Sequence, residues 1–193
     1  MTDFLIDNVK AVENNQHTLA IFLNLSKAFH SIDHKVLINK LEYFGVRGQS
    51  LDWFKNLLPQ YVQYKGISSD KQCIIRRVPQ GSVLGLRVFV IYTNDLSPSL
   101  TYTKAILFAD DTTLYASSNQ LDGLNPIFNN DLDCLCDWLK ANKLSLNIAK
   151  TNYMFSYMAL PYHANNGFSV CTVTDKIQRK DVVKFWRYIL TTN

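Results

Sequence analysis

Two adjacent aspartates interrupt an apolar, β-branched stretch, LFADDTTLY, that runs from Leu107 to Tyr115. A tight turn between two strands would project the carboxylates of Asp110 and Asp111 into one small volume. Like charges this close repel each other, so both groups ionise readily only beside a cation. Oxygen ligands of this kind suit Mg²⁺, which keeps several waters and bridges to substrate phosphates. Taken alone, an Asp-Asp pair more often marks a solvated turn.

Three further blocks accompany this pair along the chain. They are AIFLNLSKAFHSIDH at residues 20–34, VPQGSVLG at 78–85 and WLKANKLSLNIAKTNYM at 138–154. In this order and spacing, the four blocks resemble the palm of reverse transcriptases from LINE-type (non-LTR) retrotransposons of the jockey-like kind. The resemblance covers about residues 15 to 155 and extends weakly to 190. Four ordered blocks are far more specific than an isolated Asp-Asp pair.

The resemblance implies a chemistry and a set of metal ligands. Members of this family are RNA-directed DNA polymerases, nucleotidyltransferases that use an RNA template, a DNA primer, deoxynucleoside triphosphates and two Mg²⁺ ions, with Mn²⁺ as an alternative. Carried onto this chain, Asp110 is the principal ligand of the motif-C block and Asp111 is its neighbour. Asn24 stands where the motif-A aspartate that binds metal normally stands.

The resemblance also implies residues that contact the substrates. Phe29, five positions after Asn24, matches the bulky residue that excludes a ribose 2′-hydroxyl. Lys150 falls in the block that usually carries a motif-D basic residue. The loop that supports the incoming nucleotide and the template corresponds to Pro79, Gln80 and Gly81. VKFWRYIL, at residues 183–190, resembles a degenerate primer-gripping strand pair.

Several positions depart from the family pattern. The first block usually reads Leu-Asp-Leu-Ser-Lys-Ala-Phe-Asp, but here Asn24 and His30 replace both acids. An amide can ligate Mg²⁺ but brings no negative charge, so its presence costs several kcal/mol of transition-state stabilisation. At about 1.4 kcal/mol per tenfold, the rate falls on the order of a thousandfold. We therefore expect a partial, degenerate and catalytically impaired copy.

Two other function classes compete with this interpretation. The first is a zinc hydrolase, because HSIDH places His30 and His34 four residues apart, a spacing that can hold Zn²⁺ on a helix. The second is a non-catalytic remnant that binds nucleic acid through basic and aromatic residues of the C-terminal part. Its cations are Lys143, Lys150, Lys176, Arg179, Lys180, Lys184 and Arg187.

Composition sets wider limits. The 193 residues are 47% hydrophobic, which suits one globular domain with a real core. The net charge of +4 permits a nucleic-acid partner without requiring one. The four cysteines form no Cys-x-x-Cys pair, and we find no signal peptide and no apolar run long enough to span a membrane. We expect an intracellular protein, cytoplasmic or nuclear, without a membrane partner. The sequence leaves its oligomeric state open.

The elements that must position these residues follow from local patterns. A short apolar run at residues 18–25 predicts a buried strand, and Asp33 predicts a helix start that Gly45 ends. Further helices are predicted at 49–58, 82–96 and 121–141, with strands on both sides of the aspartate pair. Short strands are also predicted at 144–148, 151–157, 168–174 and 182–190.

The order of these elements predicts an α+β fold. We expect a palm-like antiparallel sheet with helices packed on one face, partial fingers and no thumb. The whole chain, 1–193, is predicted to form a single reverse-transcriptase-like domain. Its palm core covers about residues 15–155, and its degenerate primer-grip region covers about 168–190.

Overall fold

The computed structural model describes residues 2–57, 63–64, 67–68, 83–108, 111–156, 170–172, 175–180, 182–185 and 188–191. Contacts divide the chain into two compact units. The first, here called the sheet unit, comprises Met1–Ser26, Asp95–Ala141 and Ser145–Asn193. The second, the helical unit, comprises Lys27–Asn94 and Asn142–Leu144. The assignment of the chain to a single domain stays a prediction.

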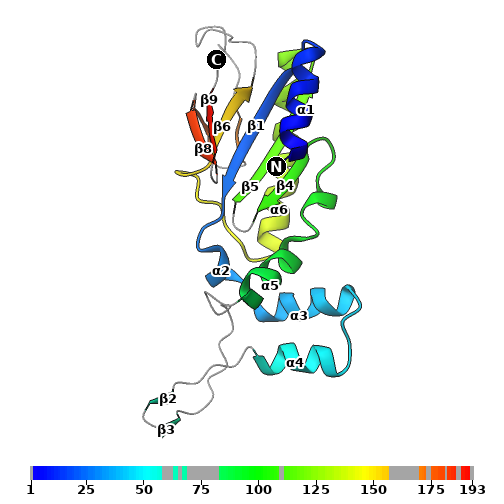
Figure 1. The fold of residues 1–193 in the computed structure, drawn as a ribbon, viewed down its shortest axis with the longest axis vertical. Coiled ribbons are helices and arrows are strands. Elements are labelled where there is room, and N and C mark those ends of the chain that lie inside the picture. The colour runs from blue at the N-terminus through cyan, green and yellow to red at the C-terminus, as the bar shows by residue number, and fades with distance from the viewer. Residues whose placement is uncertain are drawn as a thin grey trace. The chain divides into compact units, whose positions relative to one another are not determined.

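The sheet unit is built on five strands in the order β4-β5-β1-β6-β7 (Figure 1). Neighbours from β4 to β6 are antiparallel, and only β6 and β7 run parallel, so the expectation of a mainly antiparallel sheet in an α+β fold is confirmed. The strands are β1 (His17–Asn24), β4 (Lys104–Phe108), β5 (Asp111–Ser118), β6 (Asn152–Ser156) and β7 (Gln178–Arg179). The other elements of the unit are α1 (Thr2–Glu13), η1 (Ser97–Ser99), α6 (Leu121–Ala141), β8 (Val182–Phe185) and β9 (Tyr188–Thr191).

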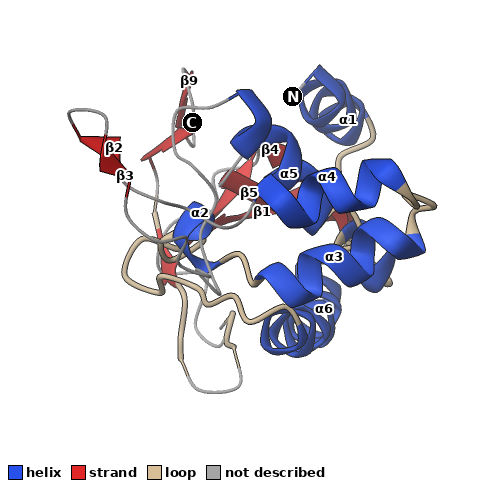
Figure 2. Ribbon diagram, turned by 90° about the horizontal axis from the view of Figure 1, so that it is seen from below, coloured by secondary structure: helices blue, strands red, loops and turns tan. Residues whose placement is uncertain are grey.

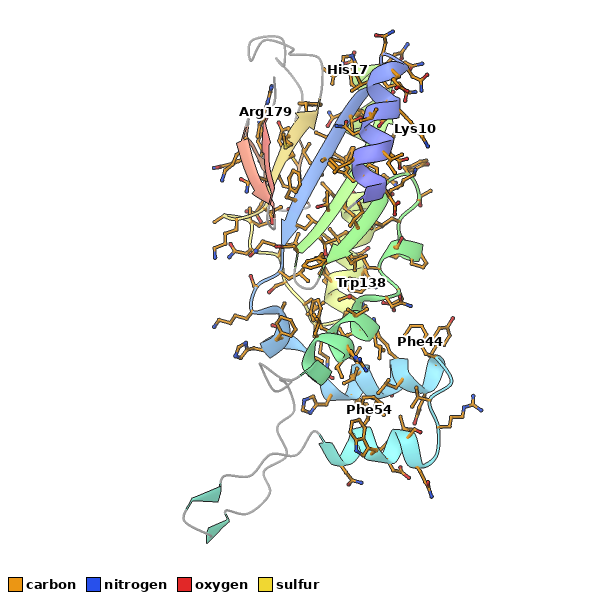
Figure 3. The ribbon with its side chains drawn as sticks, viewed as in Figure 1. Lys10, His17, Phe44, Phe54, Trp138 and Arg179 are labelled. Atoms are coloured by element: carbon orange, nitrogen blue, oxygen red, sulfur yellow. The ribbon has the colours of Figure 1, made fainter. Side chains whose placement is uncertain are left out.

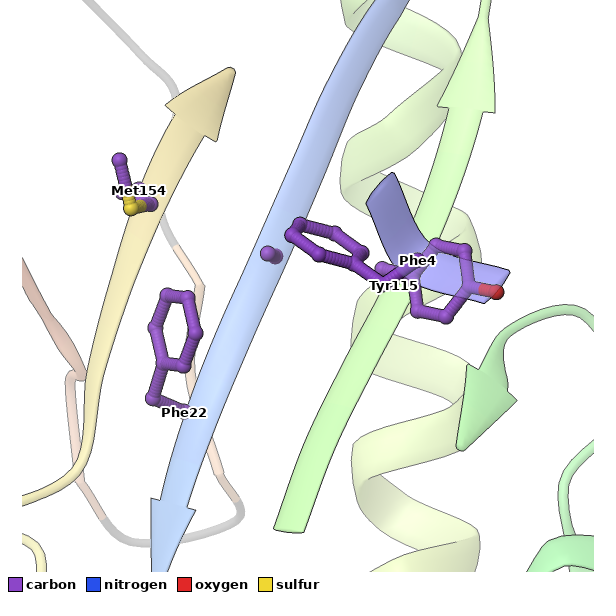
Figure 4. Close-up of a cluster of buried hydrophobic side chains, with 5 residues drawn as sticks. Phe4, Phe22, Tyr115 and Met154 are labelled. Carbon is purple, nitrogen blue, oxygen red and sulfur yellow. The ribbon is translucent and has the colours of Figure 1, made fainter. Parts of the chain in front are cut away.

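Strand β1 is the centre of this sheet. Its six inner residues are all buried, as its short apolar run predicts. On one face, Phe4 of α1 packs into a cluster with Ala20, Phe22, Tyr115 and Met154 (Figure 4). The rings of Phe4 and Tyr115 meet edge to face, with centroids 5.0 Å apart.

Helix α6 lies on the other side of the strands in the same view (Figure 4). It has the bounds that the sequence predicts, and its buried stripe has helical spacing: Leu124, Phe128, Leu132, Leu135 and Leu139. The expectation that helices cover only one face is therefore wrong, because α1 covers the opposite face. Helix α1 was not predicted, although Phe4 and Ala11, which are buried on it, are seven positions apart in the sequence.

The helical unit contains α2 (Ala28–Ser31), α3 (His34–Tyr43), α4 (Gln49–Leu57), β2 (Gln63–Tyr64), β3 (Ile67–Ser68) and α5 (Val83–Thr93). Helix α3 lies beside both α4 and α5 (Figure 2). It begins as predicted, because one oxygen of Asp33 accepts hydrogen bonds from the amides of Lys35 and Val36, both at 3.1 Å. It ends before Gly45, which has a positive φ of 88°.

The Asp33 carboxylate also binds the second stretch of the helical unit, Asn142–Leu144. Lys143 Nζ lies 2.6 Å from the second oxygen of Asp33, and the Tyr92 hydroxyl donates to the carbonyl of Asn142 at 2.7 Å. Burial raises the pKa of Asp33, but the hydrogen bonds and the charge of Lys143 outweigh this effect, so the pKa lies below its usual value. Asp33 is therefore a structural carboxylate.

Some local predictions differ from the structure. Residues 144–148 form no strand; Leu146 makes only an isolated bridge to Leu25. In the region at 182–190, β8 pairs with β9 in antiparallel register, which agrees with the strand pair expected there. Within the described ranges, no helix combines the length and the apolarity that crossing a bilayer requires.

Candidate functional site

Two of the predicted site residues face each other in the sheet. Asn24 is the last residue of β1 and Asp111 is the first of β5, and the two are direct partners in the antiparallel register. Directly opposed residues project their side chains on the same face, with Cβ atoms about 4.5–5.5 Å apart. Both residues are half-buried. The fold thus brings together two positions that lie 87 residues apart in the sequence.

Two paired strands, β4 and β5, adjoin the aspartate pair as predicted, and Asp111 itself belongs to β5. Phe108 at the end of β4 is the partner of Asp111 at the start of β5, so only Ala109 and Asp110 separate the strands. Asp110 lies outside the described residues. The register therefore locates Asp111 relative to Asn24.

The backbone of Asn24 is held by a turn at residues 147–151. The amide of Asn147 donates to the carbonyl of Asn24 at 2.8 Å, and the amide of Asn24 donates to Thr151 Oγ1 at 3.2 Å. Lys150, the predicted basic residue, belongs to the same turn and is exposed. The sequence pattern predicts Lys150 but not Asn147 and Thr151, whose role follows only from tertiary contacts.

Of the residues predicted to contact the nucleotide and the template, the structure describes Phe29 but not the loop at 79–81. Phe29 lies in α2 of the helical unit, half-buried, and its ring centroid is 5.0 Å from that of Phe89. This packing agrees with a place in the core of the helical unit, and the exclusion of a ribose 2′-hydroxyl by Phe29 stays a prediction. Pro79, Gln80 and Gly81 lie outside the described residues.

The chemistry of Asn24 and Asp111 can be compared with the needs of a divalent cation. Both side chains offer oxygen, which Mg²⁺ prefers. They fit such an ion as part of a ligand set, and they contribute one negative charge. Among the residues that the structure describes, no group of three or more His, Cys, Asp or Glu side chains is arranged to hold a metal ion. Further charge would have to come from Asp110 and from substrate phosphates.

The residues of the zinc alternative are arranged differently. His30 is exposed at the end of α2, and His34 begins α3. Asp33, between them, caps α3 and pairs with Lys143, so its oxygens already have partners. No third ligand accompanies the two histidines within the described segments. The geometry therefore gives the zinc hypothesis no support.

The basic residues of the C-terminal part are used in several ways. Lys143 pairs with Asp33, and the guanidinium of Arg179 lies over the ring of Phe155 at 5.4 Å from its centroid. Arg179 belongs to β7, next to β6 (Figure 3). Lys176 and Lys180 are exposed. Two of these cations thus have structural contacts, and the exposed ones remain available for phosphate.

A buried carboxylate, that of Asp131, supports the paired strands β4 and β5 at the end where β4 begins. Asp131 of α6 is fully buried and accepts four hydrogen bonds from residues 101–103, just before β4. The donors are the amides of Thr101 at 3.0 Å, Tyr102 at 2.9 Å and Thr103 at 2.7 Å, and the Thr103 hydroxyl at 2.8 Å. Burial raises the pKa of Asp131, but the four hydrogen bonds lower it by more than burial raises it. The pKa of Asp131 therefore lies below its usual value. No local sequence pattern marks Asp131 for this role.

Comparisons with known proteins agree with the resemblance in the motifs. A family profile described as "Reverse transcriptase (RNA-dependent DNA polymerase)" matches residues 2–185. A "Probable RNA-directed DNA polymerase from transposon BS" of Drosophila melanogaster is 29% identical over 156 residues, and an "RNA-directed DNA polymerase from mobile element jockey" of the same organism is 24% identical over 152. Each alignment covers 74% of this chain but only 17% and 16% of the two relatives.

Proposed function

Because the chain belongs to the reverse transcriptase family and resembles the jockey-like non-LTR members, we propose that the end of β1 and the start of β5 form a nucleotidyl-transfer site. The observation that carries this proposal is the register that sets Asn24 opposite Asp111. The sheet is then a palm-like sheet, and the reaction is RNA-directed DNA synthesis. The substrates are an RNA template, a DNA primer and deoxynucleoside triphosphates, in the cytoplasm or the nucleus.

The proposed metal ligands are the carboxylates of Asp110 and Asp111, with the amide oxygen of Asn24 at the third position. When bound there, Mg²⁺ or Mn²⁺ would activate a primer 3′-hydroxyl and stabilise the leaving oxygen. The protein's part is to present these oxygens on the sheet, and the opposed ends of β1 and β5 support that role.

Under the same proposal, Asn24 is the residue that lowers the rate of nucleotidyl transfer. The neutral amide leaves the site one negative charge short, and the loss corresponds to a rate lower by about a thousandfold or more. Of the remaining residues, Lys150 would contact phosphate from the turn beside Asn24. Phe29 would contact the sugar of the nucleotide, and Pro79, Gln80 and Gly81 its base and the template. A chain too impaired to polymerise would still bind primer–template through its exposed cations.

Restoring the lost acids tests this function. We expect primer extension with Mg²⁺ or Mn²⁺ to be very weak in the unaltered chain and to rise about a thousandfold in Asn24→Asp, with His30→Asp alone giving no comparable gain. Asp111→Asn in the Asn24→Asp chain is the matched control, and it should abolish the gain. Robust synthesis by the unaltered chain would contradict the proposed impairment.

Binding separates the proposed function from its alternative. If no form extends a primer, but all bind primer–template with an affinity that falls steeply with salt, the chain is a binding remnant. If no form extends or binds at low salt, both proposals are wrong.

A further inference from the structure

The hydrogen bonds at the end of β1 differ from those along the rest of the strand. The pairing of β1 with β6 ends at Phe22 and Asn152. Two residues later, the amide of Asn24 donates to a side chain, Thr151 Oγ1, instead of to a strand carbonyl. Thr151 has no exposed surface, so water does not compete for this bond.

The Thr151 hydroxyl makes two hydrogen bonds in opposite directions. It accepts from the amide of Asn24 at 3.2 Å and donates to the carbonyl of Asn147 at 3.0 Å. Donation to Asn147 fixes the hydroxyl hydrogen and turns a lone pair toward the Asn24 amide. The amide of Asn147 in turn donates a hydrogen bond to the carbonyl of Asn24 at 2.8 Å, which closes a ring of three hydrogen bonds. Both backbone polar groups of Asn24 are bound within this ring.

The ring also fixes the neighbouring turn. The carbonyl of Asn147 accepts from the amide of Lys150 at 3.0 Å and from the amide of Thr151 at 2.9 Å. Lys150 is therefore attached to the same carbonyl that orients the Thr151 hydroxyl. The buried Thr151 hydroxyl thus links the backbone of Asn24, through the carbonyl of Asn147, to the backbone of Lys150.

We propose that Thr151 is a positioning residue for the candidate site. Its hydroxyl keeps the backbone of Asn24 in the register that sets its side chain opposite Asp111, and it keeps Lys150 beside them. The role rests on the proposed function, since it concerns the position that the motif-A ligand occupies. It requires no contact between Thr151 and a substrate.

Thr18 provides a matched control at the opposite end of β1. Its exposure of 1% is close to the 0% of Thr151, and its hydroxyl also makes a hydrogen bond, with its oxygen 2.8 Å from that of Ser117. That bond joins two side chains, and it lies far along the strand from Asn24. Thr18→Val and Thr151→Val therefore remove the same group from the same unit, but only the second should alter the candidate site.

Amide hydrogen exchange measures how strongly the Asn24 amide is protected by its hydrogen bond to Thr151, and it requires no ligand. In Thr151→Val, we expect the Asn24 amide to exchange about tenfold faster than in the unaltered chain, because a buried donor loses its acceptor. Thr151→Ser keeps the hydroxyl and should stay within about twofold. Thr18→Val should leave this amide unchanged. If Thr151→Val does not fold, Thr151→Cys, a weak acceptor of similar size, replaces it.

Binding of Mn²⁺, followed by electron paramagnetic resonance, then measures the consequence for the site. In the Asn24→Asp background, we expect Thr151→Val to weaken Mn²⁺ binding three- to tenfold and Thr151→Ser to restore it, which corresponds to about 1 kcal/mol of lost orientation. Thr18→Val should bind as the background does. A purely structural role would change stability in both valine variants and Mn²⁺ affinity in neither.

The outcomes separate this inference from the function on which it rests. An unchanged exchange rate at Asn24 in Thr151→Val, or an unchanged Mn²⁺ affinity with faster exchange, overturns the positioning role alone. Failure of every form to bind Mn²⁺ overturns the proposed metal site and the positioning role with it. Equal weakening by Thr18→Val would show that any loss in the sheet has the same effect, and it would also overturn the inference.

Discussion

The two ends of the β4–β5 hairpin use a carboxylate in different ways. Where β4 begins, Asp131 is fully buried, and all four of its hydrogen bonds come from residues 101–103. Where β5 begins, Asp111 is only half-buried and faces the amide side chain of Asn24. A buried charge is stable only when the protein satisfies it, whereas a charge meant for a cation must stay accessible. The contrast separates an acid that holds the fold from one that can serve a reaction.

Removing the buried acid should have the largest effect. Asp131→Ala leaves three amides and a hydroxyl of residues 101–103 without their acceptor, so we expect the free energy of unfolding to fall by about 3 kcal/mol or more. Asp131→Asn keeps one acceptor oxygen and should cost less. Urea denaturation of the two variants and of Asp111→Asn tests the contrast. If Asp111→Asn cost as much as Asp131→Ala, the two acids would not differ in role.

The pH dependence of stability should come from the structural acids. The pKa of Asp131 and that of Asp33 are both lowered in the folded chain. A lowered pKa means that the charged form contributes stability above the unfolded value, near 3.9, and that this contribution is lost as pH falls through the folded pKa. We expect denaturant midpoints to fall steeply below about pH 4 and Asp131→Asn to flatten this slope. An unchanged slope would mean that other groups control acid unfolding.

The sequence predicts much of this contrast but not all of it. Apolar patterning locates β1 and α6, and the cap at Asp33 locates α3, because these signals are local. The register of Asn24 with Asp111 is consistent with the family blocks, but no local pattern specifies it. Asp131 and Thr151 were missed because their partners lie about 30 and 127 residues away. In the sequence, Asp131 is an ordinary polar residue beside Leu132, and Thr151 lies between two other polar residues, Lys150 and Asn152.

Restoring charge opposite Asp111 should have a smaller and conditional effect. In Asn24→Asp, two carboxylates face each other across β1 and β5, and directly opposed like charges destabilise a sheet by about 0.2–1 kcal/mol. We expect this loss without divalent ions and its recovery in Mg²⁺, because a cation between the two acids favours their charged forms. Thermal unfolding with and without Mg²⁺ measures both. Equal stabilisation of the unaltered chain by Mg²⁺ would place the binding site elsewhere.

The smallest effect should come from a third acid, Asp7 of α1, which is more exposed than the other two structural carboxylates. One of its oxygens accepts from Lys104 Nζ at 2.7 Å and from the Tyr115 hydroxyl at 2.9 Å, so α1 is bonded to β4 and β5. The hydrogen bond from Lys104 and that from Tyr115 lower the pKa of Asp7. Burial, and then the hydrogen bond to Asp7, raise the pKa of Tyr115.

Tyr115→Phe removes the hydroxyl and keeps the ring that packs on Phe4. Asp7 retains Lys104 and contact with water, so no buried group loses its only partner, and we expect a loss of about 0.5 kcal/mol in the free energy of unfolding. Asp131→Ala differs in that its donors lose their acceptor where water cannot replace it. Denaturation of both variants under one set of conditions gives the ratio. A loss in Tyr115→Phe as large as that in Asp131→Ala would show that burial of the carboxylate does not set the cost, and the distinction between the two ends of the hairpin would then need another cause.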